Sequence, residues 1–284
     1  MNLPPILGSL RAIDHCVLPV ADLGAARARH EALGFVVAPE GRHPFGTHNA
    51  CVHFADGSFL EPLSIGDAEA AALAASQGNV FVARDAAWRG ANGNNGFSAL
   101  VLRTGDASAD HERFVSAGCS AGPMLSFSRP SADPAGNVAE ARFLLAFASP
   151  PPADAESFVF TCERVGVPAI DRAALTAHRN GVTGIVGVVA VADDPAPAAA
   201  FLARLCREGT VTVLGAEAGM ARFGLPARAR GLAFVAIRLR TGDLAALRAL
   251  LDGAGIGYRV GDDGTVTVPP APGQGAHLIF EDAS

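Results

Sequence analysis

Hydrophobic and polar positions form one pattern that occurs four times along the chain. In each copy a nearly continuous apolar run is followed by an aspartate and then by an alanine-rich stretch that ends near a glycine. The copies cover residues 13–35, 97–119, 184–209 and 232–256. A continuous apolar run bounded by turn residues is typical of a buried strand, and apolar positions at helical spacing are typical of a helix packed against a core. The pattern predicts a strand followed by a helix in every copy.

The ends of the predicted helices are marked by residues that commonly cap helices. An aspartate side chain at the start of a helix accepts hydrogen bonds from backbone amides that have no partner within the helix. A glycine readily adopts the backbone conformation that ends a helix. The predicted N-terminal caps are Asp22, Asp106, Asp193 and Asp243, and the predicted terminating glycines are Gly34, Gly118, Gly209 and Gly253.

Further strand-like segments follow each predicted helix. Apolar runs separated by Asp-Gly turns at positions 56–57 and 263–264 indicate these strands. The expected strands are residues 35–39, 49–54 and 58–65 in the first copy, 139–147 and 157–165 in the second, and 258–269 and 276–282 in the fourth. The third copy is less regular, and its candidate strands are residues 210–215 and 220–225.

Repeated units of this kind predict an α+β fold built from tandem βαβββ modules. One module cannot bury both faces of its sheet, whereas two modules together can wrap into an incomplete barrel with helices outside and a concave face inside. We therefore expect one pair of modules in residues 1–165 and a second pair in residues 184–284, in which the third copy is degenerate. The alternative is an α+β domain in which the repetition has no structural meaning.

Charge and composition exclude several classes of function. The formal net charge is −6, the isoelectric point is near 5.7 and the arginines are scattered, whereas nucleic-acid binding requires clustered basic residues. The chain contains no lysine, which rules out Schiff-base catalysis by a lysine and a phosphate-binding P-loop. We therefore expect neither nucleic-acid binding nor these two kinds of chemistry.

Cysteine spacing and hydropathy indicate the compartment. The five cysteines are widely spaced and form no Cys-x-x-Cys pair, which argues against a zinc knuckle or a disulfide framework. Apolar runs such as residues 182–191 are too short to cross a bilayer, and the start of the chain lacks the pattern of a secretory leader. We expect a cytoplasmic protein with reduced thiols and no membrane association.

Short motifs between residues 13 and 181 resemble a known superfamily. Residues 13–15 (Ile-Asp-His), 22–23 (Asp-Leu) and 33–35 (Leu-Gly-Phe) resemble the opening of a vicinal oxygen chelate module, the fold of glyoxalase I, extradiol dioxygenases and bleomycin-resistance proteins. The segments that resemble more specifically the glyoxalase-like domain group are residues 41–50, 56–63, 128–129 (Ser-Arg) and 178–181 (His-x-Asn-Gly). The resemblance implies this fold and a glyoxalase-like domain in residues 1–165. It leaves the activity open, because members isomerise, epimerise, cleave rings or sequester drugs.

The resemblance also implies a divalent metal on the concave face, held by residues from the first and last strands of each module. In the first module these positions correspond to His15 and Glu61, which suit iron, manganese, nickel or zinc. The second module has Ser98 or Ala99, and Phe160, at the corresponding positions. We therefore expect the usual four-ligand site to be broken, and a metal-free pocket is favoured.

Other residues could complete a metal site. His43 and His53 could do so from within the first module. His277 and Glu281 could do so only if the first and last modules meet. The candidate metal ligands are therefore His15, Glu61 and His53.

Glu61 is informative because it lies in an otherwise apolar strand, where a buried carboxylate without partners is costly. A metal, an arginine such as Arg42 or Arg129, or hydrogen bonds from a bound molecule would satisfy it. The candidate substrate-binding residues are Arg42, His43, Thr47, Asn49 and Arg129, and the candidate catalytic residues are Glu61 and His43. The histidines of the predicted helices, His30 and His111, are expected to face solvent.

These features favour a small-molecule-binding protein whose concave pocket holds an oxygen-bearing, partly apolar ligand. The alternative is a metal-dependent lyase or isomerase, or a ring-cleaving dioxygenase. In that case a metal at His15 and Glu61 polarises an oxygen atom, and Glu61 or His43 moves a proton. A third interpretation makes His15 and Glu61 an inherited pair in a pocket without a ligand. We expect a monomer or a homodimer.

Overall fold

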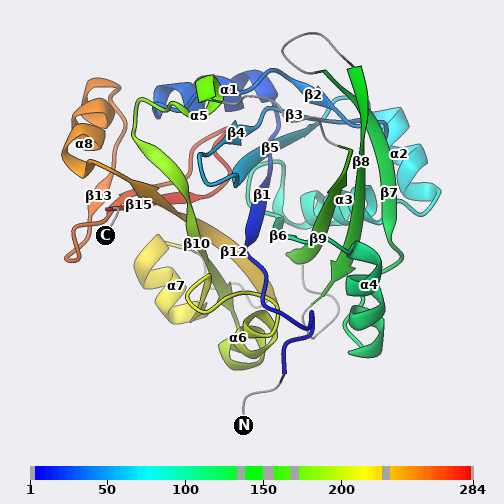
Figure 1. The fold of residues 1–284 in the computed structure, drawn as a ribbon. Coiled ribbons are helices and arrows are strands. Elements are labelled where there is room, and N and C mark those ends of the chain that lie inside the picture. The colour runs from blue at the N-terminus through cyan, green and yellow to red at the C-terminus, as the bar shows by residue number, and fades with distance from the viewer. Residues whose placement is uncertain (1–3, 133–137, 150–156, 167–172, 226–230, 283–284) are drawn as a thin grey trace.

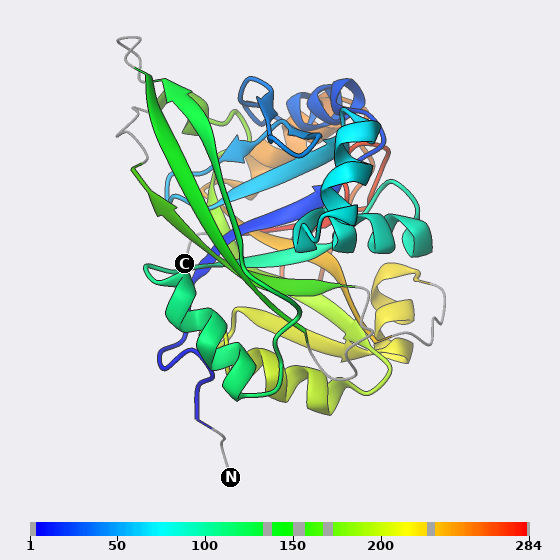
Figure 2. The ribbon, with the colours of Figure 1, turned by 90° about the vertical axis from the view of Figure 1, so that its right-hand side faces the viewer.

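The strands form two curled sheets with helices packed around them (Figures 1 and 2). This computed structural model describes residues 4–132, 138–149, 157–166, 173–225 and 231–282. In Figure 1 the first sheet, coloured blue to green, lies beside the second sheet, coloured yellow-green to red. The two half-barrels confirm the mixed fold of tandem modules that the repeat predicted.

The strands divide between the two sheets according to their position in the sequence. The first sheet contains β1 (Ile13–Pro19), β2 (Gly41–Arg42), β3 (Thr47–Asn49), β4 (Val52–His53), β5 (Phe59–Ile65), β6 (Ala99–Arg103), β7 (Leu125–Ala132), β8 (Val138–Ala148) and β9 (Phe158–Val165). The second sheet contains β10 (Val182–Ala192), β11 (Val211–Gly215), β12 (Leu232–Thr241), β13 (Arg259–Val260), β14 (Val266–Val268) and β15 (His277–Asp282). The helices are α1 (Leu23–Ala32), α2 (Ala68–Ser76), α3 (Val80–Asn92), α4 (Ala107–Ser116), α5 (Ala173–Thr176), α6 (Pro195–Ala203), α7 (Ala216–Phe223) and α8 (Leu244–Gly253).

Two modules meet at the centre of the first sheet. Its strand order is β2-β3-β5-β1-β6-β9-β8-β7, with β4 paired to β5. The first strands of the modules, β1 and β6, run antiparallel, and each pairs in parallel with the last strand of its own module, β5 or β9. The centre of the second sheet repeats this arrangement, because β10 and β12 are antiparallel and β12 pairs in parallel with β15.

Three of the four predicted N-terminal caps are confirmed. Asp22, Asp106 and Asp243 cap α1, α4 and α8, and each side chain accepts a hydrogen bond from a backbone amide of the first turn. The prediction of Asp193 is wrong by one residue, because Asp194 caps α6. Pro195 occupies the first turn of that helix, where its fixed φ angle and missing N–H are tolerated.

The apolar segment 35–39 was predicted as a strand, and this prediction is wrong. Phe35, Val37 and Ala38 are buried, but main-chain groups of the segment find their partners outside a strand ladder. The amide of Ala38 donates to the carbonyl of Cys51, and the Arg27 guanidinium donates to the carbonyls of Val37 and Ala38. The Arg27 side chain therefore satisfies carbonyl groups that a neighbouring strand would otherwise satisfy.

The segment 220–225, predicted as a strand of the degenerate third copy, belongs mainly to α7. The helix ends where Gly224 takes a left-handed conformation with a φ angle of 66°. Phe223 and Gly219 face the second sheet, and a Cβ atom at Gly219 would lie 2.7 Å from a methyl carbon of Val191. Helix α7 thus covers the concave face of the second sheet.

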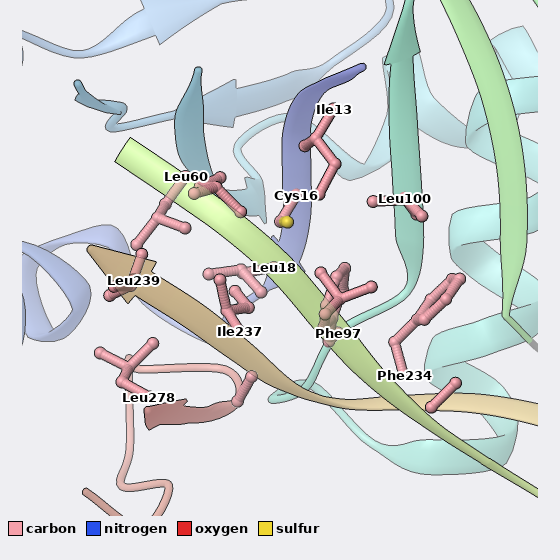
Figure 3. Packing of buried hydrophobic residues seen from close by; sticks show 14 of the residues in the cluster. Ile13, Cys16, Leu18, Leu60, Phe97, Leu100, Phe234, Ile237, Leu239 and Leu278 are labelled. Atoms are coloured by element: carbon pink, nitrogen blue, oxygen red, sulfur yellow. The ribbon is translucent and has the colours of Figure 1, made fainter. Parts of the chain in front are cut away.

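Side-chain alternation along β1 divides the first sheet into two faces. Cys16 and Leu18 belong to a large core that the two sheets share, whereas His15 and Val17 point to the concave side. Figure 3 shows this core, which also contains Ile237 of β12. The sheets therefore pack through their convex faces, and the concave face of the first sheet is left for a cavity.

The histidines of the helices do not face bulk water as predicted. His30 of α1 is fully buried, and its Nδ1 donates to the carbonyl of Ala26. Burial lowers the pKa of His30 to about 4. His111 of α4 is half-buried. The prediction for His30 was wrong because this face of α1 packs into the core, whereas His111 is partly exposed.

The His-x-Asn-Gly motif ties the second half of the chain to the first module. His178 accepts a hydrogen bond from the amide of Val36 and donates one to the carbonyl of His53. Asn180 donates to the carbonyl of Leu33. These bonds give the motif a structural role.

Hydropathy and thiol state complete the description of the fold. Among the described helices, none combines the length and the apolar character that spanning a bilayer requires. The cysteines are free thiols, of which Cys119 is half-buried and the other four are buried.

The shared core predicts that substitutions in the second sheet destabilise the chain strongly. Leu239 is fully buried between the sheets, so Leu239→Ala should lower the free energy of unfolding by about 2–5 kcal/mol. Leu73→Ala is the matched control, since Leu73 is 58% exposed and its loss should cost no more than about 0.5 kcal/mol. Urea unfolding followed by circular dichroism measures both, and equal effects would contradict the shared core.

Candidate functional site

The concave face of the first sheet encloses a cavity with a volume of about 200 Å³. Its walls are rings from β5, β7, β8, β9, α3 and the loop before β3, namely Phe59, Phe127, Phe143, Phe160, Phe81 and Phe45. Polar side chains lie among these rings: His15, His43, Asn49, His53, Glu61, Arg129 and Arg164. The cavity therefore combines aromatic walls with a small set of polar groups, as small-molecule sites commonly do.

His15 and Glu61 meet on this face, as strand alternation predicted. In the parallel pairing of β1 with β5, Val17 lies opposite Glu61 and His15 lies opposite Phe59. The His15 Nε2 atom is 3.4 Å from the Glu61 Oε2 atom, and both side chains are buried. The His15 ring also stacks on Phe59, with ring centroids 4.3 Å apart.

Asp14 completes a buried chain of charges. Its Oδ1 atom lies 2.6 Å from Nδ1 of His15, which turns Nε2 of the same ring toward Glu61. Neighbouring side chains normally point to opposite faces, but the pairing of β1 with β6 has a register shift between Ile13 and His15. Arg164 of β9 donates to the Asp14 carboxylate, and its guanidinium lies over the ring of Phe59.

These contacts favour the charged forms of His15 and Glu61. Burial alone would raise the pKa of Glu61, but the hydrogen bond and positive charge of His15 lower it to about 2. Burial alone would lower the pKa of His15, but hydrogen bonds to Asp14 and Glu61 hold it above its usual value. Glu61 is therefore a carboxylate at neutral pH, and its neighbourhood favours the imidazolium form of His15.

His43 and Asn49 lie on the other side of the Glu61 carboxylate. The Asn49 side-chain amide donates to Oε1 of Glu61 over 2.6 Å, and Nε2 of His43 is 3.8 Å from the same oxygen. Thr47 is fully buried and holds the opposite ring nitrogen of His43 at 2.9 Å. Burial lowers the pKa of His43 to about 4 against the opposing effect of Glu61, so this ring is neutral.

The two arginines proposed to neutralise Glu61 are placed very differently. The Arg42 side chain is 73% exposed, pairs with Glu40 and lies outside the cavity lining. The structure therefore contradicts Arg42 as a cavity residue, because the short strand β2 turns it outward. Arg129 lines the cavity beside Phe143 but takes no part in the contacts of Glu61. Glu61 is satisfied instead by His15 and Asn49.

Sequence reasoning missed Asp14, Arg164, Phe81 and the thiol of Cys162. Period-two alternation from Phe160 along β9 places Cys162 and Arg164 on the cavity face, so that signal was present in the sequence. Phe81 belongs to the pair of helices α2 and α3, which the repeat does not contain. The β1 irregularity that lets Asp14 reach its neighbour has no sequence signal that we recognise.

The donor set does not fit a divalent metal. The pairings of β1 with β6 and of β6 with β9 place Ala99 and Phe160 where the first module has His15 and Glu61. His53 lines the cavity and packs against the Phe59 ring, on which His15 also stacks. In the described parts of the chain, no group of three or more His, Cys, Asp or Glu side chains is arranged to hold a metal ion.

The last strand does not supply the missing ligands. His277 packs against Phe223 of α7, and Glu281 pairs with Arg238. Both residues alternate away from Leu278, which belongs to the core between the sheets. The first and last modules therefore meet through the faces opposite to those that carry these side chains.

The His15–Glu61 pair should stabilise the folded chain most between pH 4.5 and 6.5. The pKa of Glu61 falls from 4.5 to about 2, so its contribution is present above pH 4.5 and is lost as the pH falls toward 2. The pKa of His15 rises above 6.5, so its contribution is present below pH 6.5 and is lost as the pH rises through the raised value. A double-mutant cycle with His15→Gln and Glu61→Gln should give a coupling energy of roughly 0.5–3 kcal/mol near pH 5.5, decreasing toward pH 9.

The more exposed pair of His48 and Glu40, whose atoms are 3.1 Å apart, is the matched control. Its coupling energy should stay below about 1 kcal/mol. Urea unfolding of the single and double variants gives both values. A coupling energy between His15 and Glu61 that is zero near pH 5.5, or that grows at higher pH, would contradict the charged pair.

The donor set also predicts the response to metal ions. Purified wild-type protein titrated with Fe²⁺, Mn²⁺, Ni²⁺ and Zn²⁺ should bind none of them stoichiometrically at the cavity, because Glu61 is already paired. Elemental analysis after desalting should give the same metal content for the wild type, His15→Ala and Glu61→Ala. One metal per chain in the wild type, lost in both variants, would overturn the prediction.

Comparisons with known proteins agree with this architecture. A structure of a hypothetical protein from Staphylococcus aureus aligns with a TM-score of 0.65 and 10% identity, covering 95% of this chain and 99% of that one. A triple mutant of 4-hydroxymandelate synthase from Streptomyces coelicolor aligns with a TM-score of 0.57 and 12% identity, covering 99% and 93%. A catechol 2,3-dioxygenase aligns with a TM-score of 0.55 and 13% identity, covering 97% and 89%. At these identities the similarity shows the fold alone.

Sequence comparison identifies the family. No protein of curated function matches the chain. A family model described as a glyoxalase-like domain matches residues 13–206, which is most of the chain. This protein therefore belongs to the glyoxalase-like domain family, as the motifs of its first module predicted.

Proposed function

We propose that this chain binds a small, oxygen-bearing and partly apolar molecule in the cavity of its first sheet, without a metal. The observation that carries the proposal is the lining, in which six phenylalanine rings surround a few fixed polar groups. Aromatic rings favour an apolar or aromatic body, and hydrogen-bonding groups fix the orientation of its oxygen atoms. A volume of about 200 Å³ suits a ligand on the scale of one substituted ring.

The polar side of the cavity is ordered before any ligand arrives. Thr47 fixes His43, Asn49 bonds to Glu61, and His15 is held between two carboxylates. Side chains that are already held in place lose little conformational entropy when a ligand binds, which supports affinity for a small molecule. This arrangement supports a binding role as it stands.

The metal-dependent alternative has less support. A lyase, isomerase or ring-cleaving dioxygenase using His15 and Glu61 would need further ligands, and the register places Ala99 and Phe160 at the corresponding positions of the second module. The side-chain amide of Asn49 donates a hydrogen bond to Oε1 of Glu61. A metal cation would have to displace this hydrogen bond in order to bind the same oxygen. The likeness to 4-hydroxymandelate synthase and catechol 2,3-dioxygenase supports the shared fold.

A substitution that fills the cavity tests the proposal. Ala141 lies in the cavity wall with 1% exposure, so Ala141→Leu should occupy ligand space and weaken binding at least about tenfold. Ligand-observed NMR with acetophenone, benzamide, benzoate and phenylacetate measures binding to the wild type and the variant. The matched control is Ala72→Leu on the exposed side of α2, which should bind like the wild type.

Saturable binding of at least one probe that is weakened by Ala141→Leu and kept by Ala72→Leu supports the proposal. Circular dichroism confirms that both variants are folded. Absence of saturable binding for every probe, or binding that Ala141→Leu leaves unchanged, would overturn the proposal.

A further inference from the structure

One arginine of the cavity lining, Arg129, lacks in the described part of the chain the carboxylate partners that the other buried charges have. The buried carboxylates already have partners: Asp14 contacts His15, Arg164 and Arg103, and Glu61 contacts His15. Arg129 is the remaining charged side chain of the lining, and no carboxylate of the described residues lies within ion-pair distance of it. Within the described residues Arg129 is therefore a cavity cation without a carboxylate partner, which favours an anionic ligand.

The position of Arg129 suits a ligand that enters between the edges of the first sheet. Arg129 comes from the edge strand β7, and its guanidinium carbon lies over the Phe143 ring, 5.2 Å from the centroid. The ring supports the cation from one side. A guanidinium carries five N–H donors around its edge, and these can bind both oxygens of a carboxylate.

The opposite edge strand makes room for this guanidinium. Gly41 of β2 has no side chain, and a Cβ atom there would lie 2.9 Å from Nη1 of Arg129 and 2.4 Å from Oδ1 of Asn49. Any larger residue would push the guanidinium away or displace Asn49. The absence of a side chain at Gly41 thus leaves space that Arg129 and Asn49, both of which line the cavity, occupy.

The rings beside Arg129 define the other end of the ligand. Phe127 and Phe143 stack on each other with centroids 5.0 Å apart, and Phe127 also meets the edge of the neutral His43 ring at 5.6 Å. A second anionic group reaching the inner end of the cavity would face Glu61, whose carboxylate is charged. The lining therefore favours one anionic group attached to an aromatic body.

We propose that the cavity selects aromatic monocarboxylates and that Arg129 is the residue that selects the carboxylate. This inference rests on the proposed function, because it names the class of molecule that the same cavity takes. The carboxylate receives hydrogen bonds from Arg129 at the mouth, and the ring packs among the phenylalanines. Arg129 is a specificity residue in this scheme, and no covalent step is involved.

Matched acids and amides test the role of Arg129. Isothermal titration of benzoate against benzamide, and of phenylacetate against phenylacetamide, should show that the wild type prefers each acid by about tenfold or more. Arg129→Gln should weaken acid binding by about 10- to 100-fold and change amide binding by less than about threefold. Arg129→Lys keeps the charge but loses the two-pronged geometry, so its acid affinity should be intermediate.

The control is Arg42→Gln, which removes the exposed arginine of the neighbouring strand and should leave both affinities unchanged. Equal binding of acids and amides by the wild type, or an acid preference that survives in Arg129→Gln, would overturn this inference and leave the proposed function standing. Absence of binding for acids and amides alike would overturn both. Circular dichroism establishes that each variant is folded, and the amide affinity is an internal check on the cavity.

Discussion

The buried carboxylate of Glu61 is the constraint on which the site depends. Burying an unpaired charge lowers the stability of the fold by roughly several kcal/mol, so the fold must supply partners for this carboxylate. His15 and Asn49 supply them, and the charge of His15 is in turn balanced by Asp14. Asp14 is buried as well and is paired with Arg164 of the second module. One carboxylate thus fixes a chain of polar contacts that crosses the sheet.

This chain of contacts explains why the two modules of the first sheet have different roles. The first module contributes His15 and Glu61, whereas the second has Ala99 and Phe160 at the corresponding positions and contributes mainly cavity wall. Polar groups that neutralise each other leave few lone pairs for a metal, but they present a fixed surface to a ligand. In the second sheet α7 covers the concave face with Phe223, so the half-barrels have diverged in the use of that face.

Elements that depend on local sequence could be predicted, and elements that depend on a partner could not. Strands β5, β8, β9 and β15 lie close to their predicted bounds because continuous apolar runs must be buried whatever their neighbours are. The residues 35–39 have the same apolar character, but Arg27 satisfies their carbonyls and no strand pairs with them. Residues 220–225 belong mainly to a helix, in which Gly219 and Phe223 both face the sheet. These two residues are four positions apart, which is a helical spacing that the alternating pattern of a strand does not reveal.

The candidate site shows the same limit at the level of single charges. Strand alternation was enough to place His15 and Glu61 on one face, since that rule is local. The sequence offered both Arg42 and Arg129 as partners of Glu61 and gave no reason to prefer either. Only the tertiary structure shows that the two side chains lie in different environments. Arg42 reaches water and pairs with Glu40, whereas Arg129 is held over a ring inside the cavity. Which arginine is left for a ligand depends on how every other buried charge is paired, and that balance is a property of the whole sheet.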